Sequence, residues 1–451
     1  MRSESESHEI IGRALDAAQA DEADALLVSV SHNISRFANS TVHQNMSEDS
    51  ASLALRVIVG SSMGVATTSS FEPDEIARTA DLAREAAKHS SPLQNFSGLY
   101  RENEPVPSLK TFDKATAHIA PAEKAHELRA MFERGREAGA SFAGSYATSG
   151  ASIACGNTHG VRRYNLMSSS DATVIAINGA NSGYATRCGR RASDVDVQSL
   201  GDEAIDKATL RAGVIADLEP GPYDVILEPP ALAEVFDWMN LIAFSGQSFE
   251  EGSSFFVGHV GTQLLGDNFT LVDDALDDAF LPFPFDVEGL PKRRIPLIER
   301  GVIRTPVVDK VYADRLGLAP TANAWHLGWS EHGSAFHIAM DGGTSTREEM
   351  IRSTRRGIWI TRFNYVNGLL EPKSALMTGT TRDGTFLIEN GEIAGRLPNL
   401  RWTQSMVEAF RNIEALSAER RSIGTWYNMF GGTLAPTVKI RDWTISGKQT
   451  R

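Results

Sequence analysis

The clearest pattern of apolar and polar positions lies in residues 223–259. Tyr223 to Leu227 are mostly apolar and β-prone, and Pro229–Pro230 end that strand. Proline is tolerated in the first turn of a helix, and apolar residues then recur at helical spacing, namely Leu232, Val235, Phe236, Met239 and Ile242–Ala243. The pattern predicts a strand, a helix over 231–243 with one buried face, and a Gly/Ser-rich loop.

The first half of the chain alternates helical and strand-like patterns. Helices are expected over 7–20, 73–89, 121–138 and 200–214. Strands are expected over 23–31, 33–46, 53–69 (two strands joined across Gly60–Ser62), 141–154, 161–169, 171–178 and 184–192. The order helix, strands, helix thus occurs twice before residue 216, with a Ser-, Pro- and Asn-rich linker between the two occurrences.

After about residue 218 strands and turns dominate. We expect a strand at 271–274, a hairpin over 294–308 across Glu299–Gly301, short helices at 309–317 and 346–355, strands at 357–363, 374–381, 384–389, 392–395 and 436–446, and a helix near 404–416. The prediction is an α+β fold with two small N-terminal helix–sheet modules followed by a β-rich C-terminal domain. The predicted bounds are 1–92 and 121–216 for the modules, 93–120 for the linker and 217–451 for the C-terminal domain.

The composition argues against nucleic-acid-binding, secreted and membrane-spanning classes of protein. The 451 residues have a formal net charge of −13, so non-specific nucleic-acid binding is disfavoured. The two cysteines, Cys155 and Cys188, form no CxxC pattern and suit a reducing compartment. The N-terminus is polar and acidic, unlike a signal peptide, and no run approaches eighteen apolar residues. We therefore expect a cytoplasmic protein that uses neither nucleic acid nor a membrane.

The helix at 231–243 carries little chemistry of its own. In a zinc peptidase such a helix would hold a His-Glu pair and a second histidine about one turn on, but residues 219–258 contain no histidine. Glu234 is the one candidate general base there apart from Asp237. A lone carboxylate without a metal or partner has little to activate, so a helix-surface or interface carboxylate is the other interpretation.

Two further segments carry candidate residues. Three histidines, at 326, 332 and 337, crowd a Trp-rich loop, which could form a metal site or line a groove or interface. The turn at 283–289, followed by 292–294, combines aromatic, acidic and basic residues, and could form part of a peptide groove, a subunit contact or a packed turn under the sheet. The groove or interface candidates are Phe283, Phe285, Asp286, Glu288, Arg293, Trp325, His326 and His332.

Several longer runs resemble the TldD/PmbA family of peptidase subunits. The most specific is PFPFDVEGLPKRRIPLIERGVIRTPVVDKVYADRLGL at 282–318, and FLIENGEIAGRLPNL at 386–400 also fits. PTVKIRDWTISG at 436–447 and LALRVIVGSSMGVATTS at 53–69 extend the resemblance over nearly the whole chain. The family contains a TldD kind, with a His-Glu-x-x-x-His helix and a C-terminal cysteine that bind zinc, and a PmbA kind, also called TldE, without these ligands.

The resemblance places this chain with the PmbA/TldE kind. If Glu234 matches the family glutamate, Ala233 and Trp238 occupy the histidine positions; in a second register, those positions are Asp237 and Ile242. No cysteine follows Cys188. A catalytic zinc needs about three protein ligands, so we expect no catalytic residue, metal or cofactor in this chain.

The implied function is that of a zinc-free subunit of a heteromeric peptidase. The resemblance implies a TldD-like catalytic partner that holds zinc, and a substrate that is an unfolded or extended peptide. Two alternatives stay open: a stand-alone hydrolase that uses Glu234 or the histidines at 326–337, and a non-enzymatic binding protein that forms a homodimer.

Overall fold

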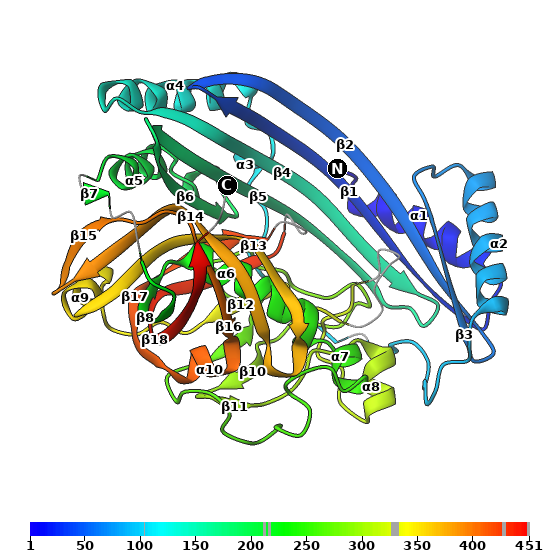
Figure 1. The fold of residues 1–451 in the computed structure, drawn as a ribbon. Coiled ribbons are helices and arrows are strands. Elements are labelled where there is room, and N and C mark those ends of the chain that lie inside the picture. Colours follow the sequence, from blue (N-terminus) through cyan, green and yellow to red (C-terminus); the bar gives the residue numbers. More distant parts are fainter. Residues whose placement is uncertain (103, 211–212, 215–217, 326–332, 426–429, 449–451) are drawn as a thin grey trace.

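Two sheets organise the molecule, and the first arches over the second (Figure 1). The computed structural model describes residues 1–102, 104–210, 213–214, 218–325, 333–425 and 430–448. Helices and strands are mixed, with short helices and many strands in the second half, which confirms the predicted α+β class. None of the described helices has the length and apolarity that crossing a membrane requires.

The N-terminal sheet is antiparallel, in the order β3-β2-β1-β4-β5-β6. Its strands are β1 (Glu22–Ala38), β2 (Thr41–Val59), β3 (Ser62–Thr68), β4 (Ser141–Asn157), β5 (Arg162–Asn178) and β6 (Asn181–Gly189). The first three come from the first predicted module and the last three from the second. Because β1 pairs with β4 along most of its length, the two modules share one continuous sheet.

Two predictions of where strands begin and end in this sheet were wrong. The strand expected at 33–46 is broken by a turn at Asn39–Ser40, where both residues have positive φ, as a tight hairpin requires. The strands expected at 161–169 and 171–178 are one strand, because β5 runs through Ser170–Asp171 and pairs with β4 and β6 there. Turn-prone residues inside a paired strand show that cross-strand context overrides local preference.

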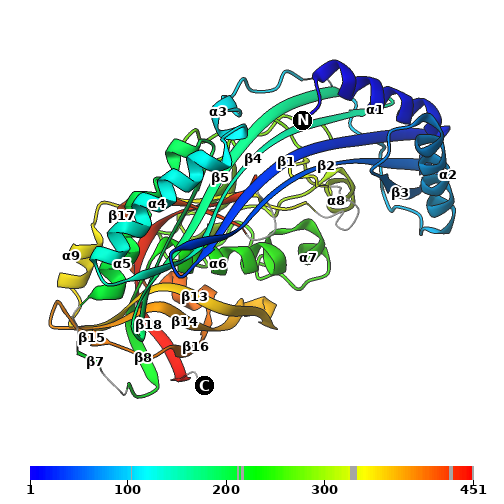
Figure 2. The same cartoon turned by 90° about the horizontal axis from the view of Figure 1, so that it is seen from above.

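Helices cover the face of this sheet that points away from the second sheet (Figure 2). They are α1 (Glu4–Ala18), α2 (Pro73–His89), α4 (Pro121–Glu137) and α5 (Val197–Thr209), with the short α3 (Lys114–Ala117) beside β4 and β5. Ala25 and Leu27 of β1 pack under the helices, whereas Leu26 and Val28 point toward the C-terminal half. This alternation follows from the two-residue period of a strand.

The second sheet has the order β11-β10-β9-β12-β18-β8-β13-β14-β15-β7, with β16 beside β14 and β18, and β17 beside β18. Its strands are β7 (Gly213–Val214), β8 (Gly221–Leu227), β9 (Leu271–Asp273), β10 (Ile295–Glu299), β11 (Val302–Ile303), β12 (His337–Met340), β13 (Arg356–Glu371), β14 (Leu376–Glu389), β15 (Glu392–Arg396), β16 (Leu400–Ser405), β17 (Ile413–Gly424) and β18 (Gly432–Lys448). The helices are α6 (Pro229–Met239), α7 (Gly246–Glu250), α8 (Lys310–Leu316), α9 (Arg347–Arg352) and α10 (Met406–Arg411).

Most predicted elements of this half exist, with different bounds. The hairpin across Glu299–Gly301 forms between β10 and β11, and α9 begins after Thr346 with a capping box. The strands expected at 374–381 and 384–389 are one strand, β14, in which Asp383 and Gly384 have positive φ. Strands β12, β16 and β17 were not predicted.

Candidate functional site

Helix α6 follows β8 directly and is almost entirely enclosed. Pro229 and Pro230 occupy its first turn, and a π-helical turn at Asn240–Phe244 extends it. It packs against β13 and β18, and Leu232, Val235 and Phe236 belong to the largest apolar core of the protein. The helix that would carry the family's zinc ligands is therefore a core element.

Glu234 has a structural hydrogen bond. Its carboxylate accepts the backbone N–H of Val366 in β13 at 3.2 Å. Burial raises the pKa of Glu234, while this hydrogen bond and the charge of Arg362 act in the opposite direction. The carboxylate thus fastens α6 to β13.

The first register of the family motif does not fit a metal. Ala233 is buried and has no ligand atom, and Trp238 packs against the backbone of β13. A Cβ added at Gly368 would lie 3.1 Å from the Trp238 ring. The Trp238 indole therefore packs closely against the backbone of β13 and fills the space that a histidine and its metal would need.

The second register does not assemble a zinc site either. Asp237 and Ile242 are both buried, and only Asp237 has a ligand atom. Across the described residues, no group of three or more His, Cys, Asp or Glu side chains is placed to hold a metal ion. The residues of α6 therefore do not fit the zinc that the family implies.

Glu228, just before α6, joins a buried cluster of charges that the sequence did not reveal. Its carboxylate accepts from Lys207 Nζ at 2.6 Å, Trp359 Nε1 at 3.0 Å and Arg347 at 3.2 Å. Lys207 also donates to Glu203 at 2.7 Å. Because these partners lie 21 to 131 positions away in the sequence, no local pattern could have identified the cluster. It connects α5 to the start of α6.

The turn at 283–292 lies between the two halves of the chain. Asp286 accepts backbone N–H groups of Glu288 and Leu290 through Oδ1, at 3.1 and 3.0 Å, and that of Ala324 through Oδ2 at 3.0 Å. Burial, followed by the charge of Glu288, raises the pKa of Asp286 to about 6. Glu288 in turn pairs with Arg56 of β2 at 3.0 Å, and Arg56 also pairs with Asp24.

The residues predicted to line a groove or an interface differ in how far they are buried. Phe283 and Phe285 are 4% and 0% exposed, packed with each other in a cluster that includes Ile153 and Met167 of the N-terminal sheet. Like Asp286 and Glu288, they sit in a packed turn under the sheet. Arg293 is exposed and donates to the carbonyl of Pro320, and Trp325 keeps part of its surface. His326 and His332 lie outside the described residues.

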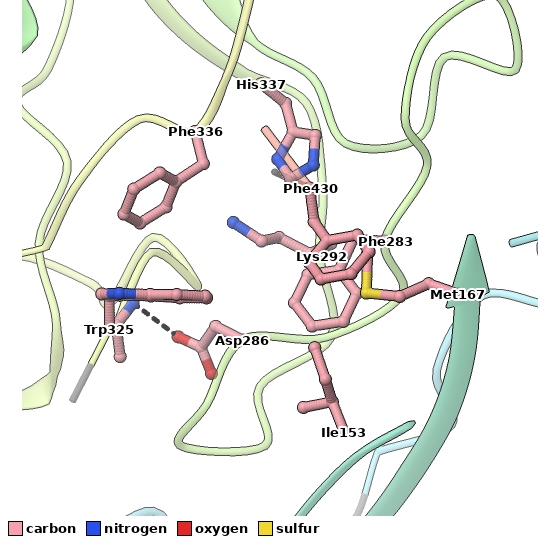
Figure 3. A pocket seen from close by; sticks show the side chains of 10 residues that line it. Ile153, Met167, Phe283, Asp286, Lys292, Trp325, Phe336, His337 and Phe430 are labelled. Atoms are coloured by element: carbon pink, nitrogen blue, oxygen red, sulfur yellow. Dashed lines mark hydrogen bonds between the residues drawn. The ribbon is translucent and has the colours of Figure 1, made fainter. Parts of the chain in front are cut away.

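A small cavity lies beside this turn (Figure 3). Its volume of about 10 Å³ is enough for one water molecule and far too small for a peptide. His337, the last histidine of the Trp-rich segment, lines it together with Lys292 and Asp286. Burial lowers the pKa of His337 to about 4, so the ring is neutral at pH 7. His337 is therefore enclosed among aromatic rings instead of facing an open groove.

Comparison with known families matches two parts of the chain. The model described as "PmbA/TldA metallopeptidase C-terminal domain" matches residues 220–447, which is just over half of the chain, and "PmbA/TldA metallopeptidase domain 1" matches residues 23–87. The second match contains β1, β2 and β3, and the first contains α6 and nearly all of the second sheet.

Curated proteins of the same family align over different lengths. The chain is 25% identical to metalloprotease PmbA of Escherichia coli O157:H7, covering 84% of this chain and 82% of that protein. It is 24% identical over 259 residues to a metalloprotease of Methanothermobacter thermautotrophicus, covering 56% of each chain. Because this second alignment spans only about half of the relative, it supports the family but transfers no activity.

Solved structures share the whole fold. TldE from Thermococcus kodakarensis superposes with a TM-score of 0.86 at 21% identity, covering 98% of this chain and 100% of that one. At this identity the likeness shows the fold alone, and it includes both sheets and their arrangement. Together with the family matches, these results show that the chain belongs to the PmbA/TldD family, as a PmbA/TldE-like member.

Proposed function

We propose that this chain is the zinc-free, non-catalytic subunit of a TldD/TldE-type metallopeptidase complex. In that complex a TldD-like subunit holds the zinc, and the present chain helps to enclose a site that admits unfolded or extended peptides. The complex would act in the cytoplasm, a location consistent with the two cysteines, which are both free and buried.

The observation that carries the proposal is the composition and burial of α6. The helix is intact and almost entirely enclosed, yet it has no imidazole, and its family-motif glutamate accepts a hydrogen bond from the backbone N–H of Val366. A catalytic zinc must be held by about three ligands while it lowers the pKa of a bound water. A helix that keeps the family's position in the fold but lacks these ligands supports a role beside an active subunit.

The test is co-expression with a TldD-like subunit from the same source. We expect a heteromeric complex by native mass, with zinc in proportion to the TldD-like subunit, and cleavage of an unfolded peptide by the complex. A chain that ignores the partner and remains a homodimer would contradict the proposal and favour the homodimeric binding protein.

Two variants separate this function from a stand-alone hydrolase. Glu234→Ala in this chain is expected to leave peptide cleavage by the complex unchanged, whereas replacing the glutamate of the partner's zinc motif by alanine should abolish it. Cleavage by the purified chain alone, lost on Glu234→Ala, would favour the hydrolase instead. Circular dichroism of the Glu234→Ala chain serves as the folding control, because the hydrogen bond to Val366 is also lost.

A further inference from the structure

The outer edge of β2 is unpaired along Thr41–Ser52, a segment that we call the β2 edge. On one side β2 pairs with β1 from Thr41 to Ile58, apart from the bulged His43. On the other side β3 pairs only with Leu53–Val59. No strand of the described chain pairs with that side of the β2 edge. A row of backbone N–H and C=O groups therefore faces outward over twelve residues, about 40 Å of strand.

The β2 edge is unusually open for a sheet edge. Residues 43–50 are all exposed, so nothing in the described structure covers them. Proteins commonly protect such edges with proline, lysine, a bulge or a covering loop. The segment contains no proline and no lysine, and the one bulge of the β1–β2 pair places its extra residue, His43, at the hairpin end, so Gln44–Ser52 runs without a bulge. Its chemistry favours addition of another extended strand.

We propose that the β2 edge is the docking site for the TldD-like partner, which pairs its own equivalent strand antiparallel to β2 and continues the N-terminal sheet into the second subunit. This inference rests on the proposed function. The match to domain 1 of the family, residues 23–87, contains the whole β2 edge. A partner from the same family therefore has a corresponding strand, and two equivalent edges can meet around a twofold or pseudo-twofold axis. Backbone pairing also tolerates the different sequences of two divergent subunits.

The charges of the β2 edge favour this partner over a second copy of the chain. Glu48 and Asp49 are exposed, and residues 41–52 contain no lysine or arginine. The cross-strand neighbour of Glu48 is His32, whose pKa is lowered chiefly by burial, so it brings no positive charge at neutral pH. A second copy would add two more carboxylates and no cation to this edge. A partner strand with lysine or arginine opposite Glu48 and Asp49 would pair favourably.

Hydrogen–deuterium exchange measures the backbone pairing directly. In the chain alone, the outward-facing amides of residues 41–52 should exchange quickly. In the purified complex we expect their exchange to slow by at least about tenfold, while the partly exposed loop at 91–98 stays unchanged. A complex that forms and leaves the β2 edge unprotected would overturn the inference without affecting the proposed function. Absence of any complex would instead contradict the proposed function.

Charge reversal tests the choice of partner. Glu48→Lys/Asp49→Lys should weaken the complex by about tenfold or more, since it places like charges opposite the partner strand. The matched control is Glu133→Lys/Glu137→Lys on the exposed face of α4, which changes the net charge equally and should not weaken the complex. If both double variants weaken it alike, the position of the charges is irrelevant and the inference fails. A chain that is already dimeric and protected at 41–52 by itself would assign the edge to a second copy and overturn the inference as well.

Discussion

Helix α6 and the β2 edge are opposite kinds of region in the same chain. Helix α6 is where the resemblance drawn from the sequence would place the family's zinc ligands, but its side chains are occupied by packing and by hydrogen bonds within the chain. The β2 edge has exposed side chains and a backbone edge without a partner in the described structure. One region is closed to new ligands, and the other is open to another chain.

The difference indicates which kind of region contributes to the stability of the fold and which is available for contact with another chain. Removing zinc ligands from a helix leaves a core element that still supports the fold, because its apolar face is unaffected. An exposed edge contributes little to stability, so its persistence over twelve residues calls for a function. Substitutions in the two regions should therefore differ in what they change, with loss of stability at α6 and loss of association at the β2 edge.

The largest effect is expected in the core around α6. Phe236 is fully buried, and its ring lies 6.3 Å from that of Phe269 and 5.7 Å from that of Phe410. Phe236→Ala should lower the free energy of unfolding by about 3–5 kcal/mol, as measured by urea denaturation. The control is Leu241→Ala on the adjacent turn, where the side chain is 61% exposed and a change within about 0.5 kcal/mol is expected. Similar losses for both would mean that α6 is not the closed element described here.

The buried charges before α6 should give the next largest effect. Lys207→Met removes the cation shared by Glu203 and Glu228 and leaves the buried Glu228 and the partly buried Glu203 with fewer partners, so a loss of about 3 kcal/mol is expected. Adding Glu228→Gln to Lys207→Met should cost less than the sum of the two single changes, which a double-mutant cycle in urea would reveal. Strict additivity would show that the two groups do not interact in solution.

The free energy of unfolding should depend on pH through two buried groups at the turn between the two halves, His337 and Asp286, whose effects oppose each other. Between about pH 4 and 6.5, His337 binds a proton in the unfolded chain but not in the folded one, so its contribution rises with pH. Asp286 behaves in the opposite way, because the folded chain keeps the proton up to about pH 6 while the unfolded chain loses it near pH 4. The two slopes offset each other in the natural chain.

Replacing His337 should make the effect of Asp286 on the pH dependence of stability visible by itself. In His337→Leu the rising part is lost, and the free energy of unfolding should fall as the pH rises from 4 to 6. The measurement is urea denaturation at half-unit pH steps on both proteins. Asp273 and Lys292, the charged neighbours of His337, remain in both chains, so both proteins carry them in the comparison. An unchanged pH profile would show that His337 does not titrate as its burial requires.

Much of the fold could be predicted because its signals are local. The strand, two prolines and apolar spacing of α6, the capping box of α9 and the β10–β11 turn are all short-range patterns. The single N-terminal sheet could not be predicted, because the β1–β4 pairing joins residues more than a hundred positions apart. The Asn39–Ser40 turn was missed for a different reason, since its turn residues stand within a run of similar polar residues.

The candidate site also has features that the sequence alone shows and features that depend on contacts between distant residues. The sequence shows directly that residues 219–258 contain no histidine, and among the described residues no group of His, Cys, Asp or Glu side chains is placed to hold a metal ion. The burial of Phe283, Phe285 and Asp286 was not predictable, because aromatic and acidic residues in a proline-rich turn are typical of both surfaces and packed turns. Only the contact with Ile153 and Met167 of the distant N-terminal sheet decides between them.

The smallest effect on stability is expected at the β2 edge, where the comparison with α6 is sharpest. Glu48 and Asp49 make no ion pair in the described structure, so Glu48→Lys/Asp49→Lys should change the free energy of unfolding of the isolated chain by less than about 0.5 kcal/mol. The same variant is expected to lose affinity for the TldD-like partner, whereas Leu241→Ala should change neither quantity. Thermal denaturation of the chain alone and native mass of the mixed subunits provide the two readouts. A loss of stability comparable to that of Phe236→Ala would mean that the edge is part of the folded core, and the distinction between the two regions would then be wrong.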